Sequence, residues 1–371
     1  MKMAAALLVG LGLCLGAPQQ GAEAILQRAV SLHKAGDLNG AIQAYREYLA
    51  VVPDSLEARS NLGAALARAG RYDEAIAEYD AGLRKNPDNP ALLLNLGLAY
   101  YKTGRHAEAA ARFERALALA PQFRDQVTML LAVCYNGLGR YKDAVALLGP
   151  MEKEKAGDAG FDYVYGTALI GDHQEPAGAA VIQRILSRGD SAEAYLLKGT
   201  LELSAHERDG ARADLEKAVA LNPKLAGAHA RLGELLLTEG ESEKARAAFA
   251  EELNLDADEF TSNLNMGVLA KADQAYADAR QYLERALKTR PNDPGVRYQI
   301  ATVDLATGNF DGARQALELL VKESAEFAEA HATLATVYYR LHRTADGDRE
   351  RAVSQKLMDE RDAVQAATRP R

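Results

Sequence analysis

Apolar residues recur at helical spacing along most of this chain, in short runs separated by glycine and proline. The segment 90–123 shows the pattern clearly, because Leu93 and Tyr100 fall on one face of a predicted helix. Gly104 then interrupts this helix, since glycine readily adopts the left-handed conformation that ends helices. A second amphipathic run follows and ends at Pro121. The segment is therefore predicted to form two antiparallel helices joined by a short turn.

This pattern repeats with a period of 34 residues. Five prolines lie at successive gaps of 34, 34, 102 and 68 residues, namely Pro53, Pro87, Pro121, Pro223 and Pro291. Steps of 34 from Ala41 pass through Asp143 but otherwise reach alanine, at Ala75, Ala109, Ala177, Ala211, Ala245, Ala279 and Ala313. A period of this length is typical of stacked helical repeats, which bind other molecules over a long surface.

The small residues have a packing reason, because two helices can cross closely only where no side chain is larger than a methyl group. The predicted crossing residues of the first helices are Gly63, Gly97, Gly199, Gly233 and Gly267, with Ala29, Ala301 and Ala335 as equivalents. Large residues are predicted to fill the space beside them, namely Tyr45, Tyr79, Phe113, Leu215, Phe249, Leu283 and Leu317.

These motifs resemble the tetratricopeptide repeat, a family of 34-residue helix-turn-helix units. One repeat carries the matching residues Leu62-Gly63, Leu66, Gly70, Tyr72, Ala75, Tyr79 and Pro87. About ten repeats can be placed, beginning near Ala22, Leu56, Pro90, Asp125, Ala159, Ala192, Ala226, Phe260, Pro294 and Ala328. The resemblance covers nearly all of the chain after residue 21 and implies an all-α, right-handed helical-repeat solenoid.

The repeats between residues 125 and 191 diverge from the common register. Three small residues lie one position later than expected, namely Ala132, Gly139 and Ala144. Gly166 follows this slip, whereas Ala177 is back in register. We therefore predict a one-residue insertion before the fourth repeat, a compensating shortening of the turn at 171–176, and a loose joint at 151–160. Ordinary divergence of repeats explains the slip, and a functional hinge is the alternative.

The two ends of the chain differ from the array. Near the C-terminus, Val353, Leu357 and Val364 form one apolar stripe among charged residues, which predicts a capping helix and tail at 346–371. The array itself is then assigned to residues 22–345.

Residues 1–21 do not fit the repeat. Lys2 precedes an uncharged, mostly apolar run that is followed by small residues, a pattern typical of a secretory signal peptide. This run is too short for a membrane span, so we predict an exported protein, periplasmic or secreted, with no integral span after signal removal. Lipid attachment at Cys14 is the alternative, although Leu13 departs from the small residue that precedes such cysteines. A cytoplasmic location follows if the signal is not functional.

Composition and motifs restrict the chemistry. The net charge is −8, and no cluster of lysine and arginine is long enough to follow a phosphate backbone, so nucleic acid is not an expected partner. The sequence has no glycine-rich phosphate loop, Gly-x-Ser-x-Gly, His-Glu-x-x-His or Cys-x-x-Cys motif, and its seven histidines lack metal-ligand spacing. We therefore expect no catalytic residue, metal or cofactor. A regulatory subunit, or an enzyme whose site is assembled across repeats, is the alternative.

The resemblance also implies where a partner binds, because the first helix of each family repeat lines a concave groove. The groove positions of this chain are Asn61, Arg68, Leu94, Asn95, Leu98, Tyr101, Lys102, Met129, Val133, Asn136, Tyr163, Thr167, Leu197 and Asn265. From the third to the sixth repeat this surface is strongly apolar, which favours binding of protein or peptide segments. The family resemblance implies that three asparagines, Asn61, Asn95 and Asn265, form hydrogen bonds with the backbone of the partner. Shared packing between adjacent first helices is the alternative role for each of these residues.

A basic residue recurs at the thirteenth repeat position in Lys34, Arg68 and Lys102. Some family members use such residues to bind a C-terminal carboxylate, but Leu26 and Val30 occupy other positions of that clamp, so this mode is not expected. The sequence thus predicts a non-enzymatic scaffold or adaptor. The alternative is an envelope lipoprotein that helps to assemble a surface or secretion complex.

Overall fold

The computed structural model describes residues 17–368, and it places side chains from residue 21 to residue 363 except at 123, 125 and 126. The predicted signal run and Cys14 therefore lie outside the described residues. Within the described range every regular element is a helix, which confirms the all-α prediction. The chain divides between Leu131 and Ala132 into two compact units, and each is described by itself.

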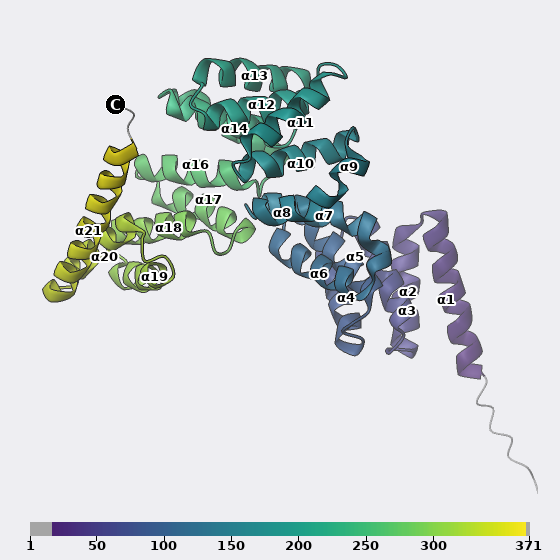
Figure 1. Ribbon diagram of the computed structural model, residues 1–371. Helices are drawn as coiled ribbons and strands as arrows, with labels where there is room; N and C mark the ends of the chain where they lie inside the picture. The colour runs from purple at the N-terminus through teal and green to yellow at the C-terminus, as the bar shows by residue number, and fades with distance from the viewer. Residues whose placement is uncertain (1–16, 369–371) are drawn as a thin grey trace, which may run out of the picture. The chain divides into compact units, whose positions relative to one another are not determined.

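The first unit contains three helix pairs and the start of a fourth. Its elements are α1 (Ala17–Ala35), α2 (Leu38–Val51), α3 (Leu56–Arg68), α4 (Tyr72–Lys85), α5 (Pro90–Lys102), α6 (His106–Leu119), the 3₁₀ helix η1 (Pro121–Phe123) and most of α7 (Arg124–Gly137) (Figure 1).

The second unit continues the series to the C-terminus. It contains α8 (Tyr141–Leu148), the 3₁₀ helix η2 (Gly149–Met151), α9 (Glu152–Lys155), α10 (Ala159–Gly171), α11 (Glu175–Leu186), α12 (Ala192–Ser204), α13 (Arg208–Leu221), α14 (Ala228–Thr238), α15 (Ser242–Leu255), α16 (Phe260–Ala272), α17 (Tyr276–Thr289), α18 (Pro294–Ala306), α19 (Phe310–Glu323), α20 (Ala328–Arg340) and α21 (Thr344–Thr368). With the single-turn α9 set aside, the described helices form ten consecutive pairs.

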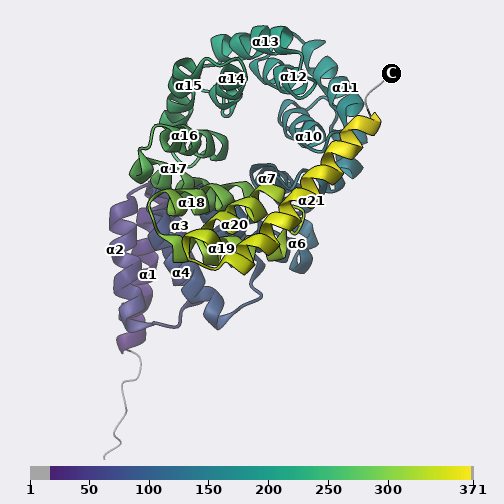
Figure 2. The ribbon, with the colours of Figure 1, turned by 90° about the vertical axis from the view of Figure 1, so that its left-hand side faces the viewer.

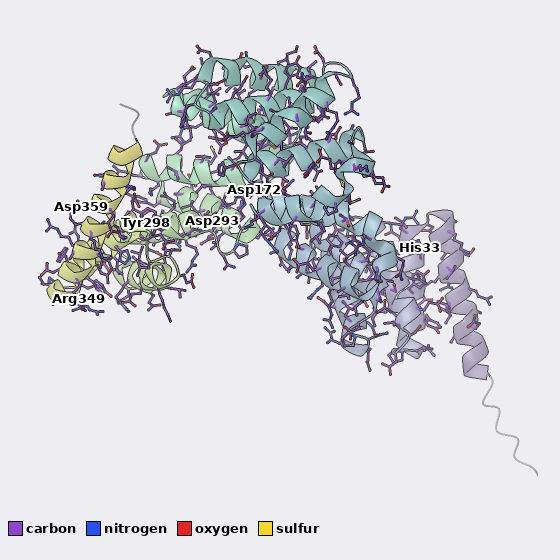
Figure 3. All side chains as sticks on the ribbon, in the orientation of Figure 1. His33, Asp172, Asp293, Tyr298, Arg349 and Asp359 are labelled. Carbon is purple, nitrogen blue, oxygen red and sulfur yellow. The ribbon has the colours of Figure 1, made fainter. Side chains whose placement is uncertain are left out.

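Local sequence explains where the first helix of a pair begins. Asn89 precedes α5, and its side-chain oxygen accepts a hydrogen bond of 3.0 Å from the Leu92 amide. Asp293, which is labelled in Figure 3, caps α18 in the same way, and its side-chain oxygen accepts a hydrogen bond of 2.9 Å from the Val296 amide. Proline follows each cap at the first helical position, where no amide hydrogen is needed. The repeat register predicted the starts of seven first helices to the residue, namely Leu56, Pro90, Ala159, Ala192, Phe260, Pro294 and Ala328.

The turn within each pair requires one residue of left-handed conformation. Glycine supplies it in six pairs, at Gly36, Gly70, Gly104, Gly139, Gly240 and Gly308. Residues with side chains supply it in the other four, at His173, His206, Gln274 and His342, with φ between 57° and 62°. Three of the seven histidines therefore lie at turn positions.

The crossing glycines pack as the sequence predicted. A Cβ atom on Gly97 would lie 2.6 Å from the ring of Phe113, and one on Gly233 would lie 2.5 Å from the ring of Phe249. Both rings are fully buried. The helices of a pair can approach this closely only because the crossing position has no side chain.

The divergent repeats show the predicted one-residue slip, but the compensating shortening lies at a different place in the chain. Ala144 is fully buried at the crossing position of α8, as the slip requires. In α11 the buried small residue is Gly178, so the register of Ala177 with the other alanines is coincidental. The predicted shortening of the 171–176 turn is wrong, because three residues separate α10 from α11 just as three separate α12 from α13. The missing residue lies later, since α11 and α12 start 17 residues apart whereas α15 and α16 start 18 apart.

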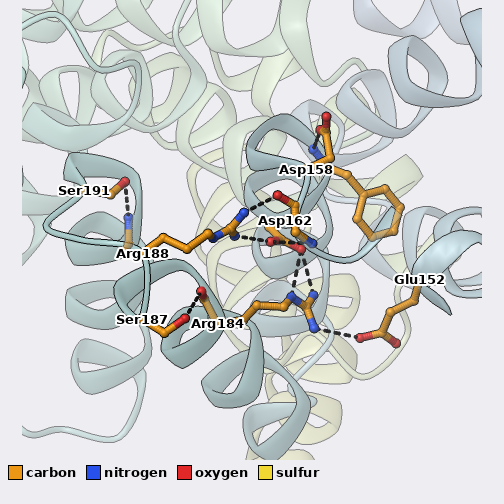
Figure 4. Close-up of polar contacts among 10 residues, drawn as sticks. Glu152, Asp158, Asp162, Arg184, Ser187, Arg188 and Ser191 are labelled. Carbon is orange, nitrogen blue, oxygen red and sulfur yellow. Dashed lines mark hydrogen bonds and ion pairs between the residues drawn. The ribbon is translucent and has the colours of Figure 1, made fainter. Parts of the chain in front are cut away.

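The segment before α10, where a loose joint is predicted, is joined to α11 through a buried carboxylate (Figure 4). The Asp162 side chain is completely buried and accepts hydrogen bonds from Arg184 at 2.8 Å and Arg188 at 2.6 Å. It also accepts one from the Gly157 amide at 3.1 Å. Arg184 extends to Glu152 of α9 at 3.4 Å, so the network ties the irregular segment to α11.

A second buried carboxylate caps α14. Gly227 precedes this helix with φ of 82° and has no side chain to cap it. Glu252 of α15 replaces the cap, since its carboxylate accepts hydrogen bonds from the Gly227 amide at 2.7 Å and the Ala230 amide at 3.3 Å. Burial raises the pKa of Glu252, partly opposed by these amide hydrogen bonds.

The last helix, α21, is the second member of the tenth pair. It begins at Thr344, and a Cβ on Gly347 would lie 2.5 Å from the ring of Tyr339, as at the other crossings. Ser354 is buried and donates a hydrogen bond of 2.9 Å to the Ala328 carbonyl, whereas Val353 is 40% exposed. Of the predicted apolar stripe, Val353 is therefore exposed and Leu357 is half-buried, and the Val364 side chain lies outside the described residues. Residue 346, the predicted start of this helix, lies within it.

The second unit curves until two distant repeats meet. The Arg290 Nε atom, after α17, donates a hydrogen bond of 2.8 Å to the Gly137 carbonyl at the end of α7. Its guanidinium lies 3.8 Å from the centre of the Phe260 ring. Figure 2 shows the intervening helices following this curve.

Candidate partner-binding surface

The first helices of the second unit form the inner side of the curve. In Figure 2, α10, α12 and α14 lie inside, and their partners α11, α13 and α15 lie outside. The inner helices enclose a hollow of about 370 Å³, here called the concave hollow. Its principal lining residues are Tyr141, Tyr163, Thr167, Ile170, His173, Leu196, Leu197, Thr200, Ser204 and Arg231.

The concave hollow combines apolar walls with a few polar groups. The hydroxyl groups of Thr167 and Thr200 donate to carbonyl oxygens of their own helices, at 2.8 and 2.7 Å. Burial raises the pKa of Tyr163 to about 12, so its phenol is protonated at neutral pH. Arg231 pairs with Glu234 at 2.6 Å, and this carboxylate is the main reason that the pKa of the guanidinium is raised. Such a surface suits a segment with apolar side chains and a polar backbone.

The first unit has a corresponding hollow of about 350 Å³, here called the N-terminal hollow. It is lined by Glu23, Leu26, Gln27, Val30, Ser31 and Lys34 of α1 and by Glu57 of α3. Sequence reasoning considered Leu26 and Val30 only as evidence against carboxylate binding. The repeat register could have identified this hollow, because Leu26, Gln27, Val30 and Lys34 occupy the same repeat positions as the predicted groove residues of later repeats.

Some of the predicted groove residues of the first unit are exposed enough to contact a partner, and others are buried. Arg68 is exposed, and its Nη1 lies 3.4 Å from the His33 carbonyl near the end of α1. Lys102 is also exposed, with its Nζ 5.8 Å from the centre of the Tyr101 ring. Leu98, Tyr101 and Met129 are half-buried. Leu94 is only 7% exposed, so it packs within the array.

The predicted asparagines have different environments. Asn61 and Asn95 are half-buried, and neither forms a side-chain hydrogen bond to another described residue. Asn136 donates to the Val164 carbonyl at 2.9 Å and so joins α7 to α10. Asn265 donates to the Thr261 carbonyl of its own helix at 2.9 Å. Asn136 thus has a structural role, and partner binding by Asn61 and Asn95 stays a prediction.

The remaining predicted residues lie at the concave hollow or near it. Tyr163 and Thr167 line it and are half-buried, and Leu197 lines it while only 3% exposed. Val133 is half-buried on α7. The repeat positions therefore identified part of a real concave surface, but they did not distinguish exposed side chains from buried ones.

Two models of the tetratricopeptide repeat match this chain. One matches residues 26–90, 65–122, 196–260 and 231–295, and the other matches residues 100–165 and 270–337. The matched segments cover more than half of the sequence. The chain belongs to the tetratricopeptide repeat family. As a protein of this family it is a protein-interaction scaffold, a class that is typically non-catalytic.

Solved structures share this tetratricopeptide-repeat fold. The APC/C hetero-tetramer Cut9-Hcn1 contains a chain that matches with a TM-score of 0.53 and 12% sequence identity, covering 93% of this chain and 88% of that chain. At this identity the likeness concerns the fold alone. No curated protein matches this chain in sequence.

Two further observations concern only residues 17–368. No helix there is both long enough and apolar enough to cross a membrane. That same range contains no group of three or more histidine, cysteine, aspartate or glutamate residues arranged to hold a metal ion.

Proposed function

We propose that this tetratricopeptide repeat protein is a non-enzymatic adaptor that binds a segment of a partner protein on its concave surface. The observation that carries the proposal is the concave hollow of about 370 Å³, which lies at the groove positions of α10, α12 and α14. Apolar side chains of the partner would pack against the rings of Tyr141 and Tyr163, which line this hollow and are half-buried. The hydroxyl oxygens of Thr167 and Thr200 would accept hydrogen bonds from its backbone.

The N-terminal hollow and the half-buried Asn61 and Asn95 extend the same proposal to the first unit. Asparagine offers both a donor and an acceptor, so it can pair with an extended backbone of any sequence. Apolar contacts would then select the partner, because only suitable side chains fit the hollows.

The test is affinity purification from the native source followed by mass spectrometry. Thr200→Arg would fill the concave hollow of the second unit, and Leu98→Glu would place a charge at a predicted groove position of the first unit. Ala213→Arg is the matched control, since Ala213 is exposed on α13 of the outer layer. Circular dichroism first establishes that all variants remain helical.

A partner retained by wild type and by Ala213→Arg, but lost by Thr200→Arg or Leu98→Glu, would support the proposal. Equal recovery of that partner by all four proteins would overturn it. For a partner that passes the first test, a photo-crosslinking residue at position 200 would identify the bound segment.

We further propose that the protein is exported, on the basis of Lys2 and the apolar run that follows it. Fractionation of the native host and N-terminal sequencing of the mature chain test this. A mature chain beginning after the apolar run is expected. An intact N-terminus in the cytoplasm would refute export, and a lipid mass on Cys14 would indicate anchoring instead.

A further inference from the structure

A larger hollow lies on the other side of α12. Its volume is about 580 Å³, and it runs between α11 and α12, so we call it the α11 groove. It is lined chiefly by Pro176, Ala179, Ile182 and Leu186 of α11 and by Lys198, Leu201 and Glu202 of α12. Leu196, Leu197, Thr200 and Ser204 face the concave hollow instead. The two hollows therefore use different faces of the same helix.

The α11 groove has a cause in the sequence. In six other repeats, large apolar residues occupy the position before the small crossing residue and the third position after it, namely Leu62 and Leu66, Leu96 and Tyr100, Leu131 and Tyr135, Tyr165 and Leu169, Leu232 and Leu236, and Leu334 and Tyr338. Most of these side chains are buried. In the sixth repeat the crossing residue is Gly199, and the two positions hold Lys198 and Glu202.

These two polar side chains turn toward α13 instead of filling the space beside α11. The Lys198 Nζ lies 2.5 Å from the Asp214 carboxylate and 3.2 Å from Glu202. Glu202 lies close to the backbone of Gly210, where a Cβ atom would be 3.0 Å from its carboxyl carbon. Pro176 and Ala179 of α11 are therefore left exposed beside a charged wall, and Leu186 is half-buried, whereas Ile182 between them is only 4% exposed.

The charges around the groove are predominantly acidic. Glu175, Glu202 and Glu207 line it, and Lys198 is the single basic residue among its lining residues. The Lys198 ammonium is already shared between Glu202 and Asp214. Glu175 and Glu207 are exposed and form no ion pair with another described residue. The groove therefore has spare negative charge and favours a cationic occupant.

The shape of the groove indicates the kind of occupant. Glu175, Ala179, Ile182 and Leu186 recur at helical spacing, so the lining follows the whole length of the 12-residue helix α11. An apolar groove along a helix is the geometry that receives an amphipathic helix. We propose that the α11 groove docks a basic amphipathic helix of a partner protein, with apolar residues against α11 and lysine or arginine against Glu175 and Glu207.

The test uses the full chain and a synthetic amphipathic helix of about 14 residues composed of leucine and lysine. Its fluorescence anisotropy is measured with wild type and with Ala179→Trp, which fills the groove. Ala180→Trp is the matched control, because Ala180 is the next residue, is exposed and does not line the groove. A second peptide carries glutamate in place of lysine.

We expect binding of the lysine peptide to wild type and to Ala180→Trp, with affinity about tenfold lower for Ala179→Trp. Glu207→Gln should weaken binding, and the loss of affinity should be greater at low salt than at high salt, because salt screens the attraction between the charges. A photo-crosslinker on the peptide should label α11 or α12. Equal binding by the two tryptophan variants, or by the glutamate peptide, would overturn the proposal.

The concave surface is tested independently. Ala179→Trp leaves Thr200 and the rest of the concave hollow unaltered. If this variant no longer binds the lysine peptide but keeps the partner of the concave surface, the result concerns only the α11 groove.

Discussion

Replacing Gly233 by alanine tests the close helix crossing on which each repeat depends. The glycine lies on α14, and an added Cβ would be 2.5 Å from one atom of the Phe249 ring and 2.8 Å from two others. Ordinary contact with a Cβ begins at 3.4 Å. The ring is fully buried, so it or the helix must move by about 1 Å to accommodate one methyl group.

Two effects of opposite sign determine the result. Alanine favours a helix over glycine by about 1 kcal/mol. Overpacking of a tight core costs about 1–3 kcal/mol. The contacts at Gly233 are short and involve a rigid ring, so we take about 2 kcal/mol for the cost. The net prediction is a loss of about 1 kcal/mol in the free energy of unfolding.

The measurement is urea unfolding followed by circular dichroism, comparing midpoints at equal slope. Gly160→Ala is the control, because Gly160 is exposed on α10 and a Cβ there would meet only the Asp158 Oδ1 atom, at the ordinary contact distance of 3.4 Å. This control should stabilise its helix. Gly233→Ala combined with Phe249→Leu should lose less than the sum of the single changes, since the ring is the obstacle. A Gly233→Ala protein as stable as the control variant would refute the crossing geometry.

Three further predictions follow from the fold. Gln274→Gly should raise the free energy of unfolding by about 0.5 kcal/mol, because relief of left-handed strain exceeds the entropy that glycine adds to the unfolded chain; a lower urea midpoint would contradict this. In a Cys14→Ser background, Cys134 should react with a thiol reagent only after unfolding, since it is fully buried and its pKa is raised to about 12 by that burial; rapid labelling of the native protein would count against it. Because the pKa of Glu252 is raised above its ordinary value of 4.5, the folded state binds this proton more tightly than the unfolded state. Wild type should therefore lose stability relative to Glu252→Gln as pH rises from 4.5 through the raised value, and parallel pH profiles of the two urea midpoints would refute this.

The sequence determined the repeat architecture well because its signals are local. A cap, a turn glycine and a crossing glycine recur in register, so helix starts such as Pro90 and Phe260 could be assigned to the residue. The errors arose where one position admits two explanations. Ala177 fits the alanine register, yet Gly178 is the residue that the packing requires, and only the course of the chain through α11 distinguishes them.

The candidate site was predictable in position but not in exposure. The repeat register placed Tyr163, Thr167 and Leu197 at a concave hollow, but whether a leucine is covered depends on the neighbouring helices. The α11 groove was missed, although its signal is visible in the sequence. Lys198 and Glu202 replace apolar residues, and a comparison of repeats would have identified the gap.

The contact between Arg290 and Gly137 has a consequence for how the protein unfolds. In helical arrays each repeat usually contacts only its immediate neighbours, so the repeats can unfold one after another from either end. This hydrogen bond joins positions 153 residues apart, and the intervening pairs are already ordered, so forming it costs little chain entropy. Loss of the ninth and tenth pairs would leave it intact. Unfolding that proceeds past Arg290 would instead release the end of α7 as well, so the middle pairs of the second unit should melt as one cooperative block rather than one after another.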